Sequence, residues 1–225
     1  MWAVSQAAPL RRVEVEEDLC LYEYEPPLQG AGYASGGFFA NLKVSGSMLL
    51  GSQQQFFGRD STVNNLQGGA WNVVLTGVEG KTPPTYCGTN GGAPATNIDE
   101  TPKISEKPFI WTNSAGKFFL QVPGLKIGSR GSQFEEDGGH TIDFESVYVT
   151  QPEDTATLMN QKLRSGLHLV ISPGIYNLDE SLVVERSGQV ILGLGLATLV
   201  SGGSPVITVK GNVDGVRIAG LILQA

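Results

Sequence analysis

Residues 168–223, HLVISPGIYNLDESLVVERSGQVILGLGLATLVSGGSPVITVKGNVDGVRIAGLIL, decide the fold class of this chain. Apolar runs of about four residues alternate there with turns such as Pro173-Gly174 and Gly202-Gly203. The runs are residues 168–171, 181–184, 189–192, 198–200, 205–209, 216–218 and 221–223. Short strands spaced by about 8 to 10 residues predict a solenoid with three strands and about 20 to 30 residues per coil. A β-sandwich would need longer strands and more regular hairpins. We therefore expect an all-β chain built on a right-handed parallel β-helix.

The rest of the chain adds a strand-rich start, an irregular middle and one helix. Alternating apolar residues predict strands in the first 80 residues, whereas five prolines make residues 80–108 an expected irregular connector. Residues 109–122 predict a hairpin that turns at Asn113. Residues 154–167 predict a helix, with Asp154 or Thr155 as its N-cap and Gly166 at its end.

Composition and charge exclude several classes of partner. The 225 residues carry a formal net charge of -7, which disfavours binding to nucleic acid and to anionic membranes. Apolar runs stay well below the length of a membrane span, and Met1 is not followed by a secretory signal pattern. Cys20 and Cys87 lack metal-ligand spacing, and whether they stay free or pair is left open. We expect no metal and no cofactor.

Several segments together carry a resemblance to a known family. They are residues 2–12 (WAVSQAAPLRR), 45–47 (SGS), 51–55 (GSQQQ), 71–74 (WNVV), 106–109 (EKPF), 172–176 (SPGIY), 190–195 (VILGLG) and 213–221 (VDGVRIAGL). The chain is similar to secreted bacterial β-helix proteins of the glycoside hydrolase family 55 type, which are exo-β-1,3-glucanases with two tandem β-helices. The triple glutamine followed by Trp-Asn is the most specific part. Phe56, where the family tends to have Trp, and Asp60, which replaces an Asn, depart from the pattern.

The resemblance implies an organisation and a function. Residues 1–80 would form the last coils of a first β-helix, residues 81–150 a linker with a hairpin, and residues 151–225 the N-terminal helix and first coils of a second. The chain would be an internal segment of an extracellular β-1,3-glucan hydrolase, and the family's general acid, a Glu of the second β-helix, would lie beyond Ala225. The expected partners are the polysaccharide and the remainder of the same enzyme chain. A non-catalytic carbohydrate-binding or structural β-helix is the alternative, and a polysaccharide lyase using Arg59 is a third.

Candidate substrate-binding residues lie around the triple glutamine. Gln53 and Gln55 share one face of a strand, and an amide both donates and accepts hydrogen bonds, which suits sugar hydroxyls. A glutamine ladder inside the coil stack is the structural alternative. Trp71 either stacks on a sugar or, as we favour, fills the core. The expected set is Gln53, Gln55, Arg59, Trp71 and Asn72.

Other suggestive patterns have simpler interpretations. Gly193-Leu194-Gly195 lacks a third glycine and a following helix, so a coil corner is favoured over a dinucleotide loop. His140, Asp143 and Glu145 alternate and favour a solvated face over a metal site. Three carboxylates in expected turns have no partner that the sequence places opposite them, as a glycosidase requires; they are Asp179, Glu180 and Glu185. The catalytic residues are therefore unknown from the sequence.

Overall fold

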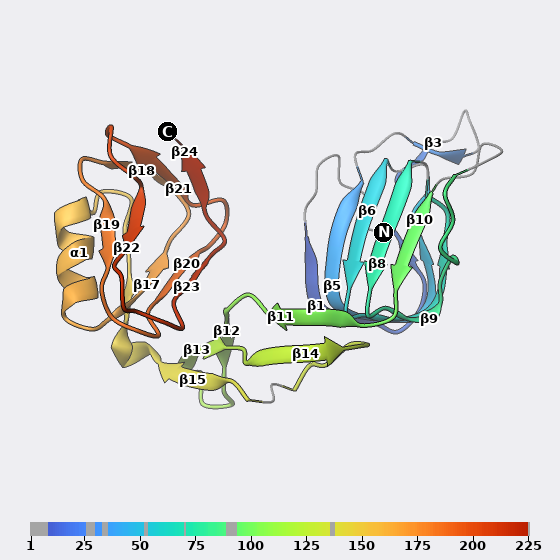
Figure 1. Cartoon of the computed structure of the whole chain (residues 1–225), viewed down its shortest axis with the longest axis horizontal. Helices are drawn as coiled ribbons and strands as arrows, with labels where there is room; N and C mark the ends of the chain where they lie inside the picture. Colours follow the sequence, from blue (N-terminus) through green and yellow to red (C-terminus); the bar gives the residue numbers. More distant parts are fainter. Residues whose placement is uncertain are drawn as a thin grey trace. The chain divides into compact units, whose positions relative to one another are not determined.

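The computed structural model describes residues 9–25, 30–32, 36–51, 54–69, 71–88, 94–135 and 138–224 (Figure 1). The chain divides into two compact units. Unit 1 contains residues 1–104 and 125–136, and unit 2 contains residues 105–124 and 137–225. In the part of the chain that the structure describes, no helix is long and apolar enough to cross a membrane.

Unit 1 consists of strands that stack mostly in parallel. Its strands are β1 (Leu10–Val15), β2 (Leu19–Cys20), β3 (Tyr24–Glu25), β4 (Gly30–Ala31), β5 (Gly37–Leu49), β6 (Gln55–Arg59), β7 (Thr62–Gln67), β8 (Asn72–Thr76), β9 (Glu79–Lys81), β10 (Ala95–Ile98), β11 (Thr101–Ser105) and β14 (Leu125–Ser129). The long strand β5 pairs with β1 and β2 on one side and with β6 and β7 on the other, all in parallel. Gly37, Phe56, Val73 and Ala95 stack in register, so one coil takes 17 to 22 residues.

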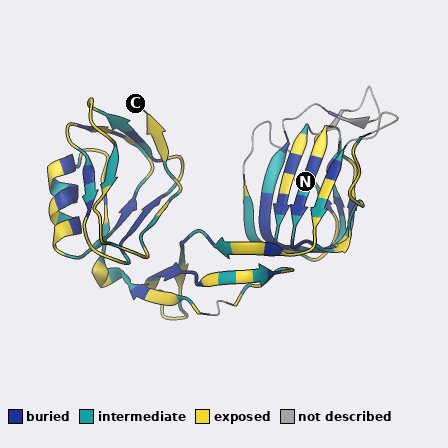
Figure 2. Ribbon diagram, viewed as in Figure 1, coloured by how far each residue is buried: buried dark blue, intermediate teal, exposed yellow. Residues whose placement is uncertain are grey.

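The core of unit 1 follows the two-residue period of its strands. Along β6, Phe56 and Gly58 are buried whereas Gln55 and Phe57 are exposed. Figure 2 shows the same alternation of buried and exposed residues along neighbouring strands. The buried cluster runs through the coils from Leu19 to Val78 and includes Phe39, Leu42 and Leu75. Each strand thus gives one side to the core and the other to solvent.

A left-handed residue turns four successive coils of unit 1 at the same place. Arg12, Asn41, Asp60 and Gly77 have φ values of 55°, 50°, 42° and 60°. They occupy equivalent positions, because the residues just before them, Arg11, Ala40, Arg59 and Thr76, are register partners in neighbouring strands. Asn, Asp and Gly are the residues that tolerate this conformation best. We call these four residues the corner column.

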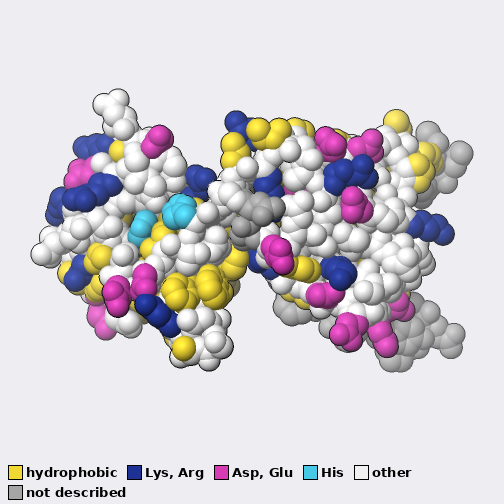
Figure 3. Space-filling view, turned by 90° about the horizontal axis from the view of Figure 1, so that it is seen from below, with side chains coloured by type: hydrophobic (Ala, Val, Ile, Leu, Met, Phe, Trp, Pro, Cys, Tyr) yellow, Lys and Arg dark blue, Asp and Glu magenta, His cyan; other side chains and the backbone are white. Residues whose placement is uncertain are grey.

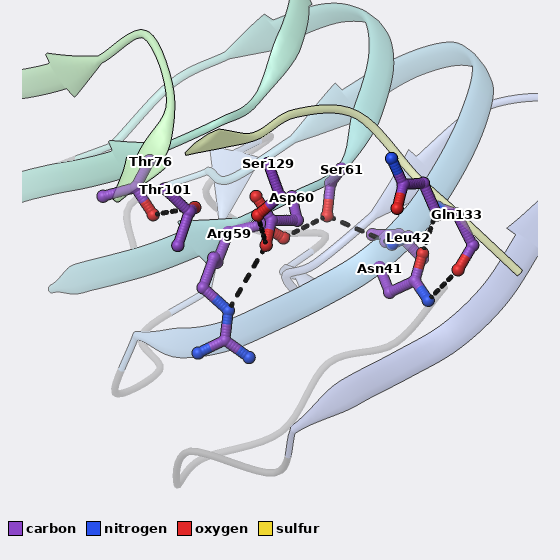
Figure 4. A network of polar contacts seen from close by, with 9 residues as sticks. All are labelled: Asn41, Leu42, Arg59, Asp60, Ser61, Thr76, Thr101, Ser129 and Gln133. Carbon is purple, nitrogen blue, oxygen red and sulfur yellow. Dashed lines mark hydrogen bonds and ion pairs between the residues drawn. The ribbon is translucent and has the colours of Figure 1, made fainter. Parts of the chain in front are cut away.

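Residues 129–134, which we call the strap, bind along the corner column. Asn41 donates through Nδ2 to Gln133 O and accepts from Gln133 N, both at 2.6 Å. Gly131 N donates to Gly77 O (2.8 Å), and Arg12 donates to Phe134 O. The corner column therefore receives its hydrogen-bond partners from a segment far along the chain (Figure 4).

Unit 2 contains three parallel sheets, a small antiparallel sheet and the helix. Its elements are β12 (Phe109–Thr112), β13 (Phe118–Val122), β15 (His140–Asp143), a 3-10 helix (Phe144–Ser146), β16 (Val147–Val149), α1 (Ala156–Arg164), β17 (His168–Ile171), β18 (Ile175–Leu178), β19 (Leu182–Val184), β20 (Val190–Gly193), β21 (Thr198–Ser201), β22 (Ile207–Val209), β23 (Arg217–Ala219) and β24 (Ile222–Gln224). The parallel sheets are β16-β17-β20-β23, β18-β21-β24 and β19-β22. Leu169, Ile191 and Ile218 stack, which gives coils of 22 and then 27 residues. The predicted three-strand parallel β-helix is confirmed.

Helix α1 packs against the first coil of unit 2. Thr155 is its N-cap and accepts from Leu158 N (3.2 Å), while Gly166 follows the helix at φ 96°. Its apolar side joins the core that includes Met159, Leu163 and Leu182. The buried side chain of Asn160 bonds the backbone of the β19 segment: Nδ2 donates to Ser181 O and Oδ1 accepts from Val183 N, both at 2.8 Å. The helix thus supplies the polar partners that a preceding strand would otherwise supply.

The middle of the chain is more regular than the sequence suggests. Residues 80–108, expected to be irregular, contain β10 and β11. The predicted hairpin is present as β12 and β13, whose turn is held by Asn113 Oδ1 accepting from Ala115 N and Lys117 N at 3.0 Å. With β15 these strands form a sheet whose inner side packs on Val170 and Leu192 of the coils. Residues 81–150 therefore contribute to both units, and the domain boundaries at 80 and 150 stay a prediction.

Removing the amide of Asn160 should destabilise unit 2. In Asn160→Ala the amide of Val183 and the carbonyl of Ser181 lose these partners in a partly buried setting, at up to about 1 to 3 kcal/mol for each unpaired group. Urea denaturation measures the change, with exposed Gln161→Ala on the same helix as the control, expected within about 0.5 kcal/mol of the parent. Equal stability of the two variants would contradict this role for Asn160.

Acid should also destabilise unit 2 through His168. Burial lowers the pKa of His168 below 6.5, the charge of the nearby His140 lowers it further, and Nδ1 accepts from Val190 N (3.1 Å); Figure 3 shows the two histidines, in cyan, on the same face. The folded state thus favours the neutral ring, so the stability it contributes is present above pH 6.5 and lost as pH falls through the folded-state pKa.

The non-titrating variant His168→Asn, which keeps an acceptor for Val190 N, tests this dependence. Its melting temperature should fall less than that of the parent between neutral pH and mild acid. His140→Gln serves as the comparison, because it removes only the neighbouring charge. Identical pH profiles for the parent and His168→Asn would show that another group is responsible.

Candidate functional site

The outward side of β5, β6 and β8 in unit 1 brings together polar and aromatic side chains. Gln55, Phe57 and Arg59 point away from the core because they alternate with buried Phe56 and Gly58. Gln55 is the register partner of Asn72, and both are exposed. Phe38 is likewise the register partner of Phe57. We call Arg11, Phe38, Gln55, Phe57, Arg59 and Asn72 the outward face.

Two arginines lie over an aromatic ring of the outward face. The rings of Phe38 and Phe57 are 5.5 Å apart and tilted by 57°. The Cζ atom of Arg11 lies 4.4 Å from the centroid of the Phe38 ring, and the Cζ atom of Arg59 lies 5.7 Å from it. Phe57 keeps 38% of its surface exposed. The result is an aromatic surface with positively charged donors on one side and amides on the other.

Polar contacts beneath the outward face hold β6 at the corner (Figure 4). Ser61 Oγ donates to Arg59 O (2.8 Å) and accepts from Leu42 N (3.1 Å). Ser129 Oγ of β14 donates to Asp60 Oδ2 (2.9 Å), and Arg59 Nε lies 3.9 Å from the same oxygen. Because Asp60 and Ser129 are buried, the backbone next to Arg59 is fixed.

The structure brings together three of the five predicted site residues. Gln55, Arg59 and Asn72 share the outward face, so the internal-ladder alternative does not apply to Gln55. Gln53 lies outside the described residues. Trp71 was expected to fill the core, which is wrong: it precedes β8 and is 59% exposed.

Residue 56 does not offer a ring for sugar stacking. Phe56 is only 5% exposed and packs so closely on Gly37 that a Cβ there would lie 2.6 Å from its ring. The exposed ring is that of the next residue, Phe57. Phe38 and Arg11 also belong to the outward face, and no motif in the sequence indicates them. The sequence QFFGR (residues 55–59) has two adjacent phenylalanines and so fits either choice of face, and pairing with β5 and β8 decides it.

The other suggestive patterns carry no catalytic arrangement. Among the described residues, no group of three or more His, Cys, Asp or Glu side chains could hold a metal ion. Asp143 instead pairs with Lys117, which lowers the pKa of that carboxyl group. Cys20 and Cys87 are free, and Gly195 forms a turn at φ 52°. The three turn carboxylates Asp179, Glu180 and Glu185 are exposed, and Glu180 accepts from Thr157 Oγ1 (2.9 Å).

Comparison with known proteins identifies relatives over the whole chain. The chain is 36% identical to an exo-beta-1,3-glucanase of Streptomyces sp. (strain SirexAA-E / ActE), in an alignment that covers 100% of this chain and 36% of the relative. The solved structure of sacteLam55A from Streptomyces sp. SirexAA-E superposes with a TM-score of 0.86 at 37% identity, covering 99% of this chain and 39% of that one. A variant of sacteLam55A in complex with glucose gives a TM-score of 0.86 at 36% identity, with the same coverage.

The chain therefore spans little more than a third of the length of these relatives. The model of one family, described as the LAM55 pectate lyase-like domain, matches residues 147–225, which contain α1 and the coils of unit 2. The resemblance to glycoside hydrolase family 55-like β-helix proteins is thereby confirmed, and residues 147–225 are similar to the LAM55 pectate lyase-like domain.

Proposed function

We propose that this chain forms the glucan-binding part of an extracellular exo-β-1,3-glucanase, with the outward face of unit 1 contacting the polysaccharide. One observation carries the proposal. The exposed amides of Gln55 and Asn72 are register partners beside the exposed ring of Phe57. They lie in a chain that is 36% identical along its length to an exo-beta-1,3-glucanase.

The chemistry of the outward face suits a neutral sugar. Amide groups donate and accept at once, as sugar hydroxyls require, and an aromatic ring packs against the C–H side of a pyranose. Arg59 adds donors, and Trp71 adds a second exposed ring next to Asn72 along the chain. The formal net charge of -7 disfavours an anionic polymer as the ligand of the whole chain.

Binding and bond cleavage are assigned to different parts of the enzyme. A glycosidase places two carboxyl groups on either side of the bond it breaks, and the named residues of the outward face include no carboxylate. We therefore assign cleavage to a part of the tandem β-helix enzyme other than the outward face. In this proposal residues 1–80 end the first β-helix, residues 81–150 link the two, and residues 151–225 begin the second. The lack of a carboxylate among those residues equally suits the second candidate, a non-catalytic carbohydrate-binding β-helix.

Binding of laminarihexaose, measured by calorimetry, tests the proposal. Phe57→Ala, Gln55→Ala and Asn72→Ala should each weaken binding about two- to tenfold, because each removes one stacking or hydrogen-bonding contact. The free energy of unfolding of Gln55→Ala and Asn72→Ala should stay within about 0.5 kcal/mol of the parent, as is usual for exposed positions. The matched control is Asn64→Ala, an exposed residue of β7 outside the outward face. Unchanged binding in all three variants would contradict the assignment of the face.

Release of reducing sugar decides between the two candidate functions. We expect the 225-residue chain alone to release no reducing sugar from laminarin, because a general acid contributes about 10² to 10⁴-fold to the rate. Release in a longer form that includes the second β-helix favours the glucanase, whereas binding without release in that form favours the non-catalytic alternative.

A further inference from the structure

The outward face places two like charges near one ring, an arrangement that a fixed anion would stabilise. The guanidinium carbons of Arg11 and Arg59 lie 4.4 Å and 5.7 Å from the centroid of the Phe38 ring. Like charges repel, and an arginine side chain has many rotamers to choose from. A fixed anion beside a guanidinium would therefore attract it and limit its rotamers, which would keep it over the ring.

Asp60 has the position and rigidity for this role. It directly follows Arg59, its Oδ2 atom lies 3.9 Å from Arg59 Nε, and the two side chains are only 10% and 13% exposed. Its backbone is fixed at φ 42°, with its N–H donating to Thr76 O (2.9 Å). Its carboxylate also accepts from Ser129 Oγ (2.9 Å), which joins it to β14. A buried pair of this kind is screened less by salt than an exposed one.

We infer that Asp60 is a positioning residue: held by the corner column and by Ser129, it keeps the guanidinium of Arg59 over Phe38 and thereby sets the affinity of the outward face for the glucan. The claim about affinity, the affinity half of this inference, rests on the proposed function. The claim about position concerns only the contact of Asp60 with Arg59. Asp60 itself lies beneath the face and acts through Arg59.

Another residue of the corner column can be compared with Asp60. Asn41 occupies the equivalent place one coil earlier, at φ 50°, and its neutral amide bonds the backbone of Gln133. An asparagine is therefore compatible with this corner. Asp60→Asn should fold normally while losing the negative charge beside Arg59. Asn41→Gly is the matched control, because it changes the same corner column without touching Arg59.

Nuclear magnetic resonance of arginine side chains tests the contact directly. With ¹⁵N-labelled arginine, the Nε–H signal of Arg59 is assigned by its absence in Arg59→Gln. We expect slow solvent exchange of this signal in the parent and in Asn41→Gly, and clearly faster exchange in Asp60→Asn. Unchanged exchange in Asp60→Asn would overturn the inference.

A double-mutant cycle on laminarihexaose binding tests the consequence for affinity. Asp60→Asn should weaken binding about three- to tenfold, because the ligand itself must then immobilise Arg59. In the Arg59→Gln background the same change should have no further effect. A merely structural role for Asp60 would instead lower affinity in both backgrounds, and that result would overturn the inference. If the parent binds no laminarihexaose, the proposed function fails together with the affinity half, and the exchange measurement alone decides the contact.

Discussion

The left-handed turn that four successive coils of unit 1 make at the same position is the constraint on which the rest of that unit depends. A non-glycine residue in this conformation costs about 1 to 2 kcal/mol, and Arg12, Asn41 and Asp60 all adopt it. The strap offsets the cost, because the side chains of Arg12 and Asn41 bond its backbone and Asp60 bonds the side chain of Ser129. Gly77 completes the corner column where no side chain fits: a Cβ there would lie 2.4 Å from Asp60 Oδ1 and 2.5 Å from Ser129 O.

The corner column also fixes which residues reach solvent. The side chains of a strand alternate between two faces, so a shift of one residue would exchange the inner and outer sets completely. With Asp60 held at the corner, Phe56 and Gly58 must point inward, and Gln55, Phe57 and Arg59 must point outward. The same register places Asn72 next to Gln55. The candidate site is therefore a consequence of how the coils turn, although the turn residues lie outside it.

The features that the sequence predicts correctly are local ones. Strand spacing, the cap at Thr155 and the turn at Asn113 each depend on residues a few positions apart, and each is confirmed. The missed features depend on distant pairing. The outward side of β6 is decided by strands of other coils, and the strap joins Asn41 to Gln133, 92 positions away. The sequence pattern also does not decide whether Trp71 is buried, because a large aromatic residue next to a strand fits the core and the surface equally well.

Amide side chains occupy two kinds of position in this chain, buried and exposed. Asn41, Asn160 and Gln189 are 2% to 4% exposed, and each donates its amide to a backbone carbonyl, at Gln133, Ser181 and Leu163 respectively. A buried amide without such a partner would be costly, so these residues are explained by folding alone. Gln55 and Asn72 are the same chemical type, but they are exposed and adjacent on the outward face. Folding does not require amides there, since many residues suit an exposed strand position. We propose that a ligand that exchanges hydrogen bonds with both amides accounts for their pairing beside Phe57.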